Sequence, residues 1–278
     1  MPELPEVETI RRELDREVGG RKIKAVEVTN NRSIRRHTNK KQFTSRLEGV
    51  KIKNVQRKGK YLIVNLDSGD ILVIHLGMSG QLLRHATKDP VDKHNHVTIS
   101  FTQGPQIRFV DPRTFGEMFV TTPDELNATV EELAHLGMDP VDQPVSWVVF
   151  GRLLHSHQLK LKTFLMDQSI IAGIGNIYSD EILWHAGLRY DRISNDLSSQ
   201  EIRRLYRSVV ETLHEAIKHG GSTLSDQQYV NLSGKAGGYQ QFHEVYDRDK
   251  LACRRCRAVV TKAKFQSRTT FYCEECQI

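Results

Sequence analysis

Four cysteines near the C-terminal end constrain this chain most strongly. Cys253 and Cys256 form one C-x2-C unit, and Cys273 and Cys276 form a second unit after a gap of 16 residues. Two disulfides or free redox thiols are the alternatives, but paired C-x2-C units in a chain without an export signal favour a metal site. In a zinc ribbon or hairpin finger, two such units supply four thiolates in tetrahedral geometry. Four thiolates leave no open position, so we expect one structural zinc ion per chain, which fixes a hairpin over 257–272.

The rest of the 278-residue chain has the composition of a globular protein, with 38% hydrophobic residues. No apolar run approaches the roughly 18 residues that a membrane-spanning helix needs. The N-terminal segment MPELPEVETIRREL is acidic and has no apolar core, which excludes a signal peptide. We therefore expect a monomeric protein of the cytoplasm without a membrane partner.

The charge distribution favours a polyanionic partner. The net charge is +6, and residues 250–278 contain seven lysines and arginines but only two acidic residues. A basic surface of this kind is the electrostatic footprint of nucleic-acid binding, although many basic proteins bind no polyanion.

The first half of the chain predicts one helix followed by many short strands. Val7, Ile10 and Leu14 lie on one helical face, so a helix is expected over residues 2–14. Runs rich in Val and Ile follow, and Asp67-Ser68-Gly69-Asp70 between two of them is typical of a hairpin. The expected strands cover 22–29, 50–56, 61–66, 71–76, 96–101 and 107–110. Several short strands in sequence predict a sandwich or barrel.

The pattern becomes helical after a proline-punctuated stretch. Ser198 and Glu201 form a capping box before a long amphipathic helix that ends at Gly220-Gly221. The following residues are rich in Gly, Ser, Gln and Asn and predict a mobile loop. The expected parts are a β domain over 1–133, a linker over 134–147, a helical domain over 148–221, a loop over 222–243 and the cysteine module over 244–278.

The N-terminus carries the second chemical signal. Removal of Met1 would expose Pro2 as a secondary amine, which condenses with an aldehyde to a cationic iminium and so becomes an electron sink for elimination. Glu3 and Glu6 are candidate groups for proton transfer. Proline and glutamate are also ordinary residues at a helix start, so composition alone leaves both interpretations open.

A family resemblance decides between these interpretations. Six motifs occur in the order seen in formamidopyrimidine-DNA glycosylases and cover essentially the whole chain. They are MPELPEVE at 1–8, RKGKY at 57–61, HLGMSG at 75–80, DPRTFG at 111–116, AGIGNIYSDE at 172–181 and the terminal four-cysteine finger. The chain thus resembles a bacterial member of that family.

The resemblance implies an α+β fold of two domains. The first would be an N-terminal helix with a β-sandwich, and the second a helix–two-turns–helix domain with the zinc finger. It also implies a bifunctional glycosylase and lyase that removes oxidised purines from damaged double-stranded DNA. Pro2 would be the nucleophile, Glu3 the proton donor and Glu6 a supporting carboxylate, with Lys60 near a phosphate flanking the lesion.

Further residues receive DNA-binding roles from the resemblance. Met78, Arg113 and Phe115 would fill the space left by the flipped nucleotide, where inserted side chains replace lost stacking. Without the resemblance, Met78 and Phe115 would be assigned to the core. The candidate catalytic set is Pro2, Glu3, Lys60 and Arg268, with Glu6 in support; the candidate DNA-binding set is Met78, His96, Arg113, Phe115 and Asn176.

Asn176 and Arg268 would bind backbone phosphate, although Asn176 alone predicts a helix cap. The twelve histidines suggest no metal cluster, and His94 and His96 fit surface or strand positions.

Two departures from the family pattern affect the finger. The tip is Gln266-Ser267-Arg268-Thr269-Thr270, where a turn like Gly-Arg-Gly-Thr is usual, so it lacks the glycines that a tight turn favours. Counting back from Cys273 keeps Arg268 in register. Position 247 is Asp where the family tends to have Gly.

Two rival functions remain at this point. An enzyme of the endonuclease VIII branch would share the fold and nucleophile but prefer oxidised pyrimidines; Leu4 and the pair Arg113 and Phe115 favour the purine branch. A non-catalytic DNA-binding protein is the other, and Pro2-Glu3 with Lys60 argue against it, because binding alone needs none of them.

Overall fold

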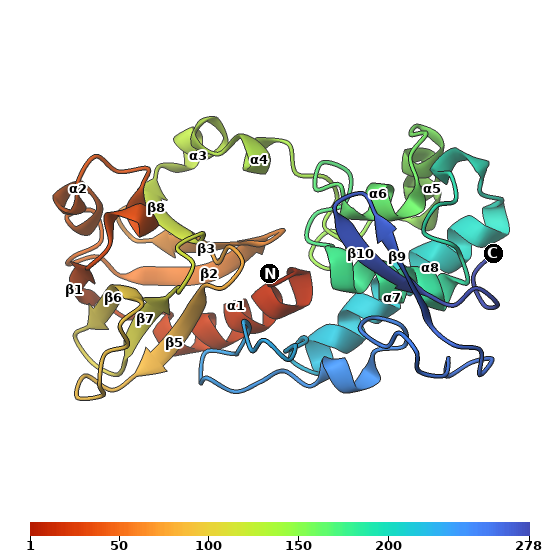
Figure 1. The fold of residues 1–278 in the computed structure, drawn as a ribbon. Helices are drawn as coiled ribbons and strands as arrows, with labels where there is room; N and C mark the ends of the chain where they lie inside the picture. The colour runs from red at the N-terminus through yellow and green to blue at the C-terminus, as the bar shows by residue number, and fades with distance from the viewer. The chain divides into compact units, whose positions relative to one another are not determined.

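The computed structural model describes residues 1–278, apart from the side chains of residues 127 and 129. The chain forms two compact units (Figure 1). The first contains residues 1–134 and 219–238, and the second contains 135–218 and 239–278. No helix of the described residues is both long and apolar enough to cross a membrane.

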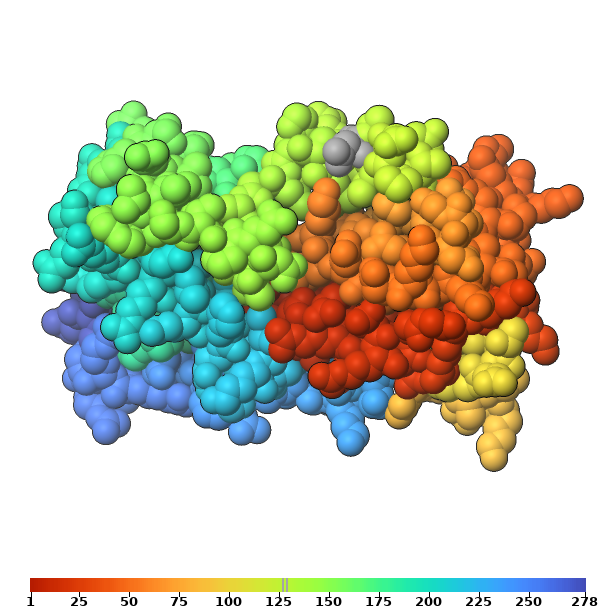
Figure 2. Space-filling model, turned by 180° about the vertical axis from the view of Figure 1, so that it is seen from behind, coloured from red at the N-terminus to blue at the C-terminus, as the bar shows by residue number. Residues whose placement is uncertain are grey.

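Helix α1 (Leu4–Val18) opens the first unit. Val7, Ile10, Leu14 and Val18 are at most 3% exposed and form the apolar face that the sequence predicts. The helix starts later than expected because Glu3 keeps extended backbone as its N-cap, and its N–H donates to the Glu6 carboxylate at 2.8 Å. In Figure 2 the outer side of α1 (red) is open at the surface, next to the orange segment that includes β2 and β3.

Two antiparallel four-stranded sheets face each other across one core. One has the order β1-β6-β7-β5 and the other β2-β3-β4-β8. Val26, Ile99 and Phe109 of the first sheet and Val55 and Leu62 of the second belong to one apolar cluster, so the expected sandwich is confirmed. The strands are β1 (Ile23–Val28), β2 (Ile52–Lys58), β3 (Tyr61–Leu66), β4 (Ile71–His75), β5 (Gln81–His85), β6 (Asn95–Phe101), β7 (Gln106–Val110) and β8 (Glu117–Thr121).

Strands β5 and β8 were not predicted. In β5 only Leu82 is fully buried, so the strand has little of the alternation that would identify it. In β8 all five residues are buried, and the strand begins with a charged residue before a short apolar run. That residue, Glu117, is held by Arg35 at 3.1 Å and Arg36 at 3.0 Å. The short elements of this unit are η1 (Asn31–Ile34), α2 (Lys40–Thr44), α3 (Pro123–Thr129) and α4 (Glu131–Ala134).

The second unit is mainly helical and ends in a hairpin. The predicted capping box of α8 is confirmed: the N–H of Ser198 donates to the Glu201 carboxylate at 2.8 Å, and the N–H of Glu201 donates to the Ser198 hydroxyl at 3.4 Å. Gly187 ends α7 in the left-handed conformation at φ 66°. The elements are α5 (Trp147–His155), α6 (Leu161–Met166), α7 (Asn176–Ala186), η2 (Ser194–Asp196), α8 (Ser199–Lys218), η3 (Tyr239–Phe242), β9 (Thr261–Phe265) and β10 (Arg268–Tyr272).

Residues 219–238 return to the first unit and are anchored there. The Glu13 carboxylate of α1 accepts hydrogen bonds from the Asn231 amide at 3.1 Å and from the Leu232 N–H at 2.9 Å. Tyr229 and Leu232 are 5% and 3% exposed and join the sandwich core. A composition rich in Gly, Ser, Gln and Asn did not indicate these anchors.

Candidate functional site

The start of α1 gathers three of the predicted residues. Pro2 is buried, and the carboxylates of Glu3 and Glu6 are 3% and 1% exposed. Glu6 accepts hydrogen bonds from the N–H of Glu3 at 2.8 Å and of Ser222 at 2.7 Å. Because each oxygen of Glu6 is bound to a different backbone N–H, this carboxylate positions the N-terminus against residue 222.

Gly221 makes room for Glu6, and sequence analysis identified only a helix end there. Gly220 and Gly221 adopt φ of 73° and 74°, a region that L side chains rarely occupy. A Cβ on Gly221 would lie 2.6 Å from the Glu6 carboxylate, and one on Gly237 would lie 2.3 Å from the carbonyl oxygen of Gly221. Gly221 is therefore required by close approach as well as by conformation.

Lys60 lies in the turn between β2 and β3 and is 9% exposed. It is therefore not the exposed lysine that its sequence alone would suggest. Arg57 supports this turn: its guanidinium donates to the Gly59 carbonyl at 3.1 Å and to the Glu8 carboxylate at 3.2 Å, and its side chain is fully buried. The turn next to Lys60 is thus tied to α1.

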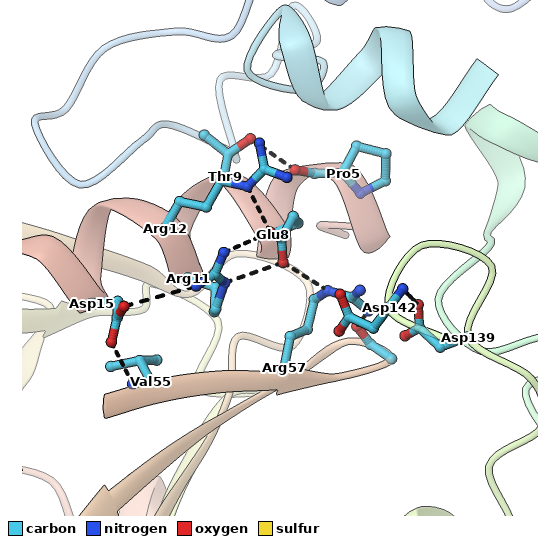
Figure 3. Close-up of polar contacts among 11 residues, drawn as sticks. Pro5, Glu8, Thr9, Arg11, Arg12, Asp15, Val55, Arg57, Asp139 and Asp142 are labelled. Carbon is cyan, nitrogen blue, oxygen red and sulfur yellow. Dashed lines mark hydrogen bonds and ion pairs between the residues drawn. The ribbon is translucent and has the colours of Figure 1, made fainter. Parts of the chain in front are cut away.

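Glu8 is the centre of an arginine cluster on α1 (Figure 3). Arg11 and Arg12 contact its carboxylate at 2.8 and 2.7 Å, and Arg57 approaches from β2. Burial raises the pKa of Glu8, but hydrogen bonds from Arg11 and Arg12 outweigh burial, so the pKa lies below its ordinary value. Sequence analysis missed Glu8, although it belongs to the first motif.

The loops 76–80 and 111–116 present the predicted space-filling side chains. Met78 and Phe115 are 40% and 43% exposed, which excludes the alternative that they are core residues. Arg113 is also exposed, and its guanidinium lies 4.9 Å from the centre of the Phe115 ring. Two large apolar side chains and a stacked arginine thus protrude from neighbouring motifs.

Asp111 holds these two loops together, a role that sequence analysis did not assign. Its buried carboxylate accepts hydrogen bonds from the Ser79 hydroxyl at 2.6 Å and the Gly116 N–H at 2.8 Å. A Cβ on Gly77 would lie 2.6 Å from the Gly116 nitrogen, so the loops also touch through their backbones.

His96 supports the same loop from β6. It is 6% exposed, and its Nε2 lies 2.7 Å from the carbonyl oxygen of Asp111. Of the two positions expected for it, the strand position is correct and the surface position is wrong, because the ring is covered. A ring buried in this way contacts the loop, not the surrounding solvent.

Asn176 and Arg268 lie at neighbouring points of the second unit. Asn176 is the first residue of α7 after the N-cap Gly175, so it is not itself the cap. Its side-chain amide donates to the carbonyl of Thr269 at 3.0 Å, directly after exposed Arg268. The start of α7 and the hairpin tip are thereby joined.

Two buried acids of α7 attach the cysteine module to the helices. Asp180 contacts Lys162 at 2.5 Å, the Thr270 hydroxyl at 2.6 Å and the Phe271 N–H at 2.9 Å. Burial raises the pKa of Asp180 to about 6. Both acids lie inside a quoted motif, yet sequence analysis gave them no role.

Glu181 holds the segment before the module. Its carboxylate accepts three backbone hydrogen bonds, from Glu244 at 2.8 Å, Val245 at 3.0 Å and Tyr246 at 2.8 Å. Burial raises the pKa of Glu181 to about 7.

The four cysteines converge as their spacing predicts. Their sulfur atoms all lie within 4.8 Å of one another, with Cys256 and Cys273 at 3.4 Å and Cys253 and Cys276 at 3.8 Å. All four are free cysteines, so the disulfide alternative is wrong. A tetrahedral site with metal–sulfur bonds of about 2.3 Å separates its sulfurs by about 3.8 Å. The cluster therefore fits a metal ion held by four thiolates.

Two family models match most of the chain. Residues 1–118 match the formamidopyrimidine-DNA glycosylase N-terminal domain, and residues 136–228 match the H2TH domain of the same enzymes. The formamidopyrimidine-DNA glycosylase of Salinispora arenicola is 42% identical over all of this chain and 96% of its own length. The protein of the same name from Pelotomaculum thermopropionicum is 38% identical over all of this chain and 99% of its own length.

Solved structures agree with the sequence relatives. Lactococcus lactis Fpg in complex with DNA containing Fapy-dG has a TM-score of 0.88 and 34% identity, over 99% of both chains. The complex of the same enzyme with abasic-site DNA has a TM-score of 0.90, again at 34% identity and 99% coverage of both chains. The predicted resemblance and the α+β fold are confirmed, and the chain belongs to the formamidopyrimidine-DNA glycosylase family.

Proposed function

We propose that this chain is a bifunctional DNA glycosylase and abasic-site lyase that removes oxidised purines from double-stranded DNA. Relatives of known structure have been solved with DNA containing Fapy-dG, an abasic site or carbocyclic 8-oxo-G. The observation that carries the proposal is the buried Pro2-Glu3 pair at the start of α1, clamped by Glu6. A protein that only bound DNA would need no buried acid beside an N-terminal proline.

The chemistry follows from the secondary amine of Pro2 once Met1 has been removed. Its nitrogen bonds to the anomeric carbon while the bond from that carbon to the base breaks, and the departing base takes up a proton. Glu3 is the proton donor and carrier at the sugar. Proton transfer to the ring oxygen opens the sugar: the bond between that oxygen and the anomeric carbon breaks, and the carbon–nitrogen bond becomes the iminium. The iminium withdraws electrons, so that loss of one proton from the sugar expels the 3′ phosphate and loss of a second proton expels the 5′ phosphate. Hydrolysis of the iminium restores the amine.

Binding residues prepare the DNA for this reaction. Lys60, Asn176 and Arg268 hold backbone phosphates, which position the duplex without reading its sequence. Met78, Arg113 and Phe115 occupy the space of the extruded nucleotide and compensate the few kcal/mol of lost stacking and pairing. His96 supports the loop that carries Arg113.

The four cysteines hold one zinc ion. With four thiolate ligands and no open position, the ion serves structure and takes no part in the reaction. It keeps the hairpin β9–β10, and with it Arg268, in place. We further propose that the enzyme is a cytoplasmic monomer that acts at the nucleoid.

A cleavage assay tests the proposed function. Duplexes would carry 8-oxoguanine, an oxidised pyrimidine or no lesion, and borohydride would be added to reduce the iminium. We expect strand cleavage and a covalent adduct on the N-terminal peptide with 8-oxoguanine. Preferential cleavage of the pyrimidine lesion would favour the endonuclease VIII branch. Binding without cleavage or adduct on any duplex would leave only the non-catalytic alternative.

A further inference from the structure

We propose that a pocket beside α8 binds a guanidinium cation of the arginine type. The pocket has a volume of about 520 Å³ and lies within the second unit, between α8, the end of α7 and residues 239–244. Sites for small ligands usually measure about 300–1,000 Å³. None of the residues proposed above for catalysis, DNA binding or zinc lines this pocket.

One wall is a polar row on an otherwise apolar helix face. Ser208, Glu211, Thr212 and Glu215 follow the spacing of neighbours on one side of α8 and all line the pocket. Ser208 and Thr212 are only 7% and 4% exposed. Packing alone would favour apolar residues at such covered positions, so the row is suited to a polar occupant.

One acceptor in the pocket lacks a partner. Oε2 of Glu244 is buried and has no hydrogen-bond partner, while its other oxygen lies 3.9 Å from Arg254. The hydroxyl-bearing side chain of Tyr239, which is 2% exposed, lines the same pocket. The backbone of Glu244 is fixed because its N–H is bound to Glu181. An unsatisfied buried acceptor destabilises the empty pocket, and a ligand with N–H donors would satisfy it.

The charge of the pocket favours a cation. Glu211, Glu215 and Glu244 place three carboxylates around it in a chain whose net charge is +6. Arg207 contacts Glu211 at 2.8 Å and Lys218 contacts Glu215 at 3.0 Å, but their side chains are 76% and 68% exposed. Such solvent-exposed pairs contribute little, so a cation that enters the pocket can replace them.

The aromatic wall distinguishes guanidinium from ammonium. Phe242 is 43% exposed, and its ring stacks on Tyr239 with a centroid distance of 6.3 Å and an interplanar angle of 27°. A planar guanidinium can lie on an exposed ring while its five N–H donors reach acceptors in its own plane. An alkylammonium offers no flat face and only three donors.

Calorimetric titration with matched ligands tests the proposal without DNA. Nα-acetyl-arginine amide should bind at least tenfold more tightly than the citrulline analogue, which has the same shape but no charge. Nα-acetyl-lysine amide should fall between them. Equal binding of the arginine and citrulline compounds, or no binding of the arginine compound, would overturn the proposal. A Gly-Gly-Arg-Gly-Gly peptide distinguishes the sources: tighter binding than the free amide assigns the site to a peptide, and equal binding assigns it to a free guanidine.

Variants locate the binding site. Tyr239→Phe removes a hydroxyl from the pocket wall, and Glu244→Gln removes the charge of the unpartnered acceptor. Phe242→Leu removes the exposed ring at a position where folding is not at risk. Each should weaken arginine amide by about fivefold or more. Glu131→Gln removes one negative charge, as Glu244→Gln does, but at an exposed position of the first unit. It should leave the affinity for arginine amide unchanged. Unaltered affinity in all three pocket variants would place any binding elsewhere and refute the proposal.

Discussion

At the scale of single residues, Asp247 carries backbone strain. It adopts a φ of 56°, the left-handed region that glycine enters without strain. We predict that Asp247→Gly raises the free energy of unfolding by about 1 kcal/mol, because a side chain in this region costs about 1–2 kcal/mol. Urea unfolding of the zinc-loaded protein measures the gain. Asp247→Ala keeps the Cβ and should show no gain; an equal gain would mean that the carboxylate, not the backbone, is unfavourable.

Gln266 at the finger tip also adopts the left-handed backbone conformation although it is not glycine. Its φ is 53°, and its side-chain amide donates to the Thr163 hydroxyl at 3.3 Å. That contact offsets part of the strain, so the altered tip keeps a two-residue turn and Arg268 stays at the start of β10. The hairpin therefore places Arg268 directly after the turn.

Gly221 offers a test of the Glu6 clamp. Gly221→Ala would drive a Cβ to 2.6 Å from the Glu6 carboxylate and disturb its bonds to residues 3 and 222. We predict a loss of base excision of at least tenfold, with DNA affinity within about threefold of the original because the proposed phosphate contacts lie elsewhere. Single-turnover kinetics and a binding titration separate the two effects.

Gly234→Ala is the matched control for that experiment. Gly234 has the same φ of 74°, but a Cβ there meets nothing within 4 Å. It carries the same backbone penalty without the contact. If both variants lost the same activity, backbone strain in the 219–238 segment would explain the loss and the clamp would have no role.

At the scale of secondary-structure elements, the buried pair Lys162 and Asp180 joins α6, α7 and β10. Removing one charge of a buried pair leaves the other without compensation, which costs about 3–5 kcal/mol. We predict that Lys162→Met and Asp180→Asn each destabilise the protein by this amount. The double variant should cost less than the sum of the two, because neither charge is then left alone. Urea unfolding of all four proteins gives the coupling energy, and strict additivity would contradict the prediction.

Helices that a short stretch of sequence identifies could be predicted. A strand that depends on residues far away in the sequence could not. The apolar face of α1 and the capping box at Ser198 need only a few neighbouring residues to be recognised. Strand β8 depends on Arg35 and Arg36 to neutralise Glu117, which sequence periodicity does not reveal. The same holds for the site: the motifs identified Pro2 and Glu3, but Ser222 lies 216 residues from Glu6, and no local pattern joins them.

At the scale of the whole molecule, the two units should respond differently to acid. In the first unit, burial lowers the pKa of His75 to about 4. The ring of His75 stacks on that of Tyr61, with their centroids 4.5 Å apart. In the second, burial raises the pKa of Asp180 and Glu181 to about 6 and 7. Between pH 7 and 4.5 these acids bind protons in the folded state before the unfolded state does, so acid favours the fold there. Burial lowers the pKa of His243 to about 4 and opposes this effect.

Acid has the opposite effect on stability through His75: it destabilises the fold there, whereas it stabilises the fold through the two acids. As the pH falls from 6.5 towards 4, the unfolded chain binds a proton at His75 while the folded chain does not, so stability is lost in this window. At about 1.4 kcal/mol per pKa unit, the loss reaches at most about 2 kcal/mol at pH 5. We predict that His75→Gln removes this part of the pH dependence in the first unit. Hydrogen exchange of the β3 and β4 amides, measured between pH 7 and 5, reports on that unit separately from the second one. If those amides lost the same protection in both proteins, another group would have to cause the acid sensitivity of the sandwich.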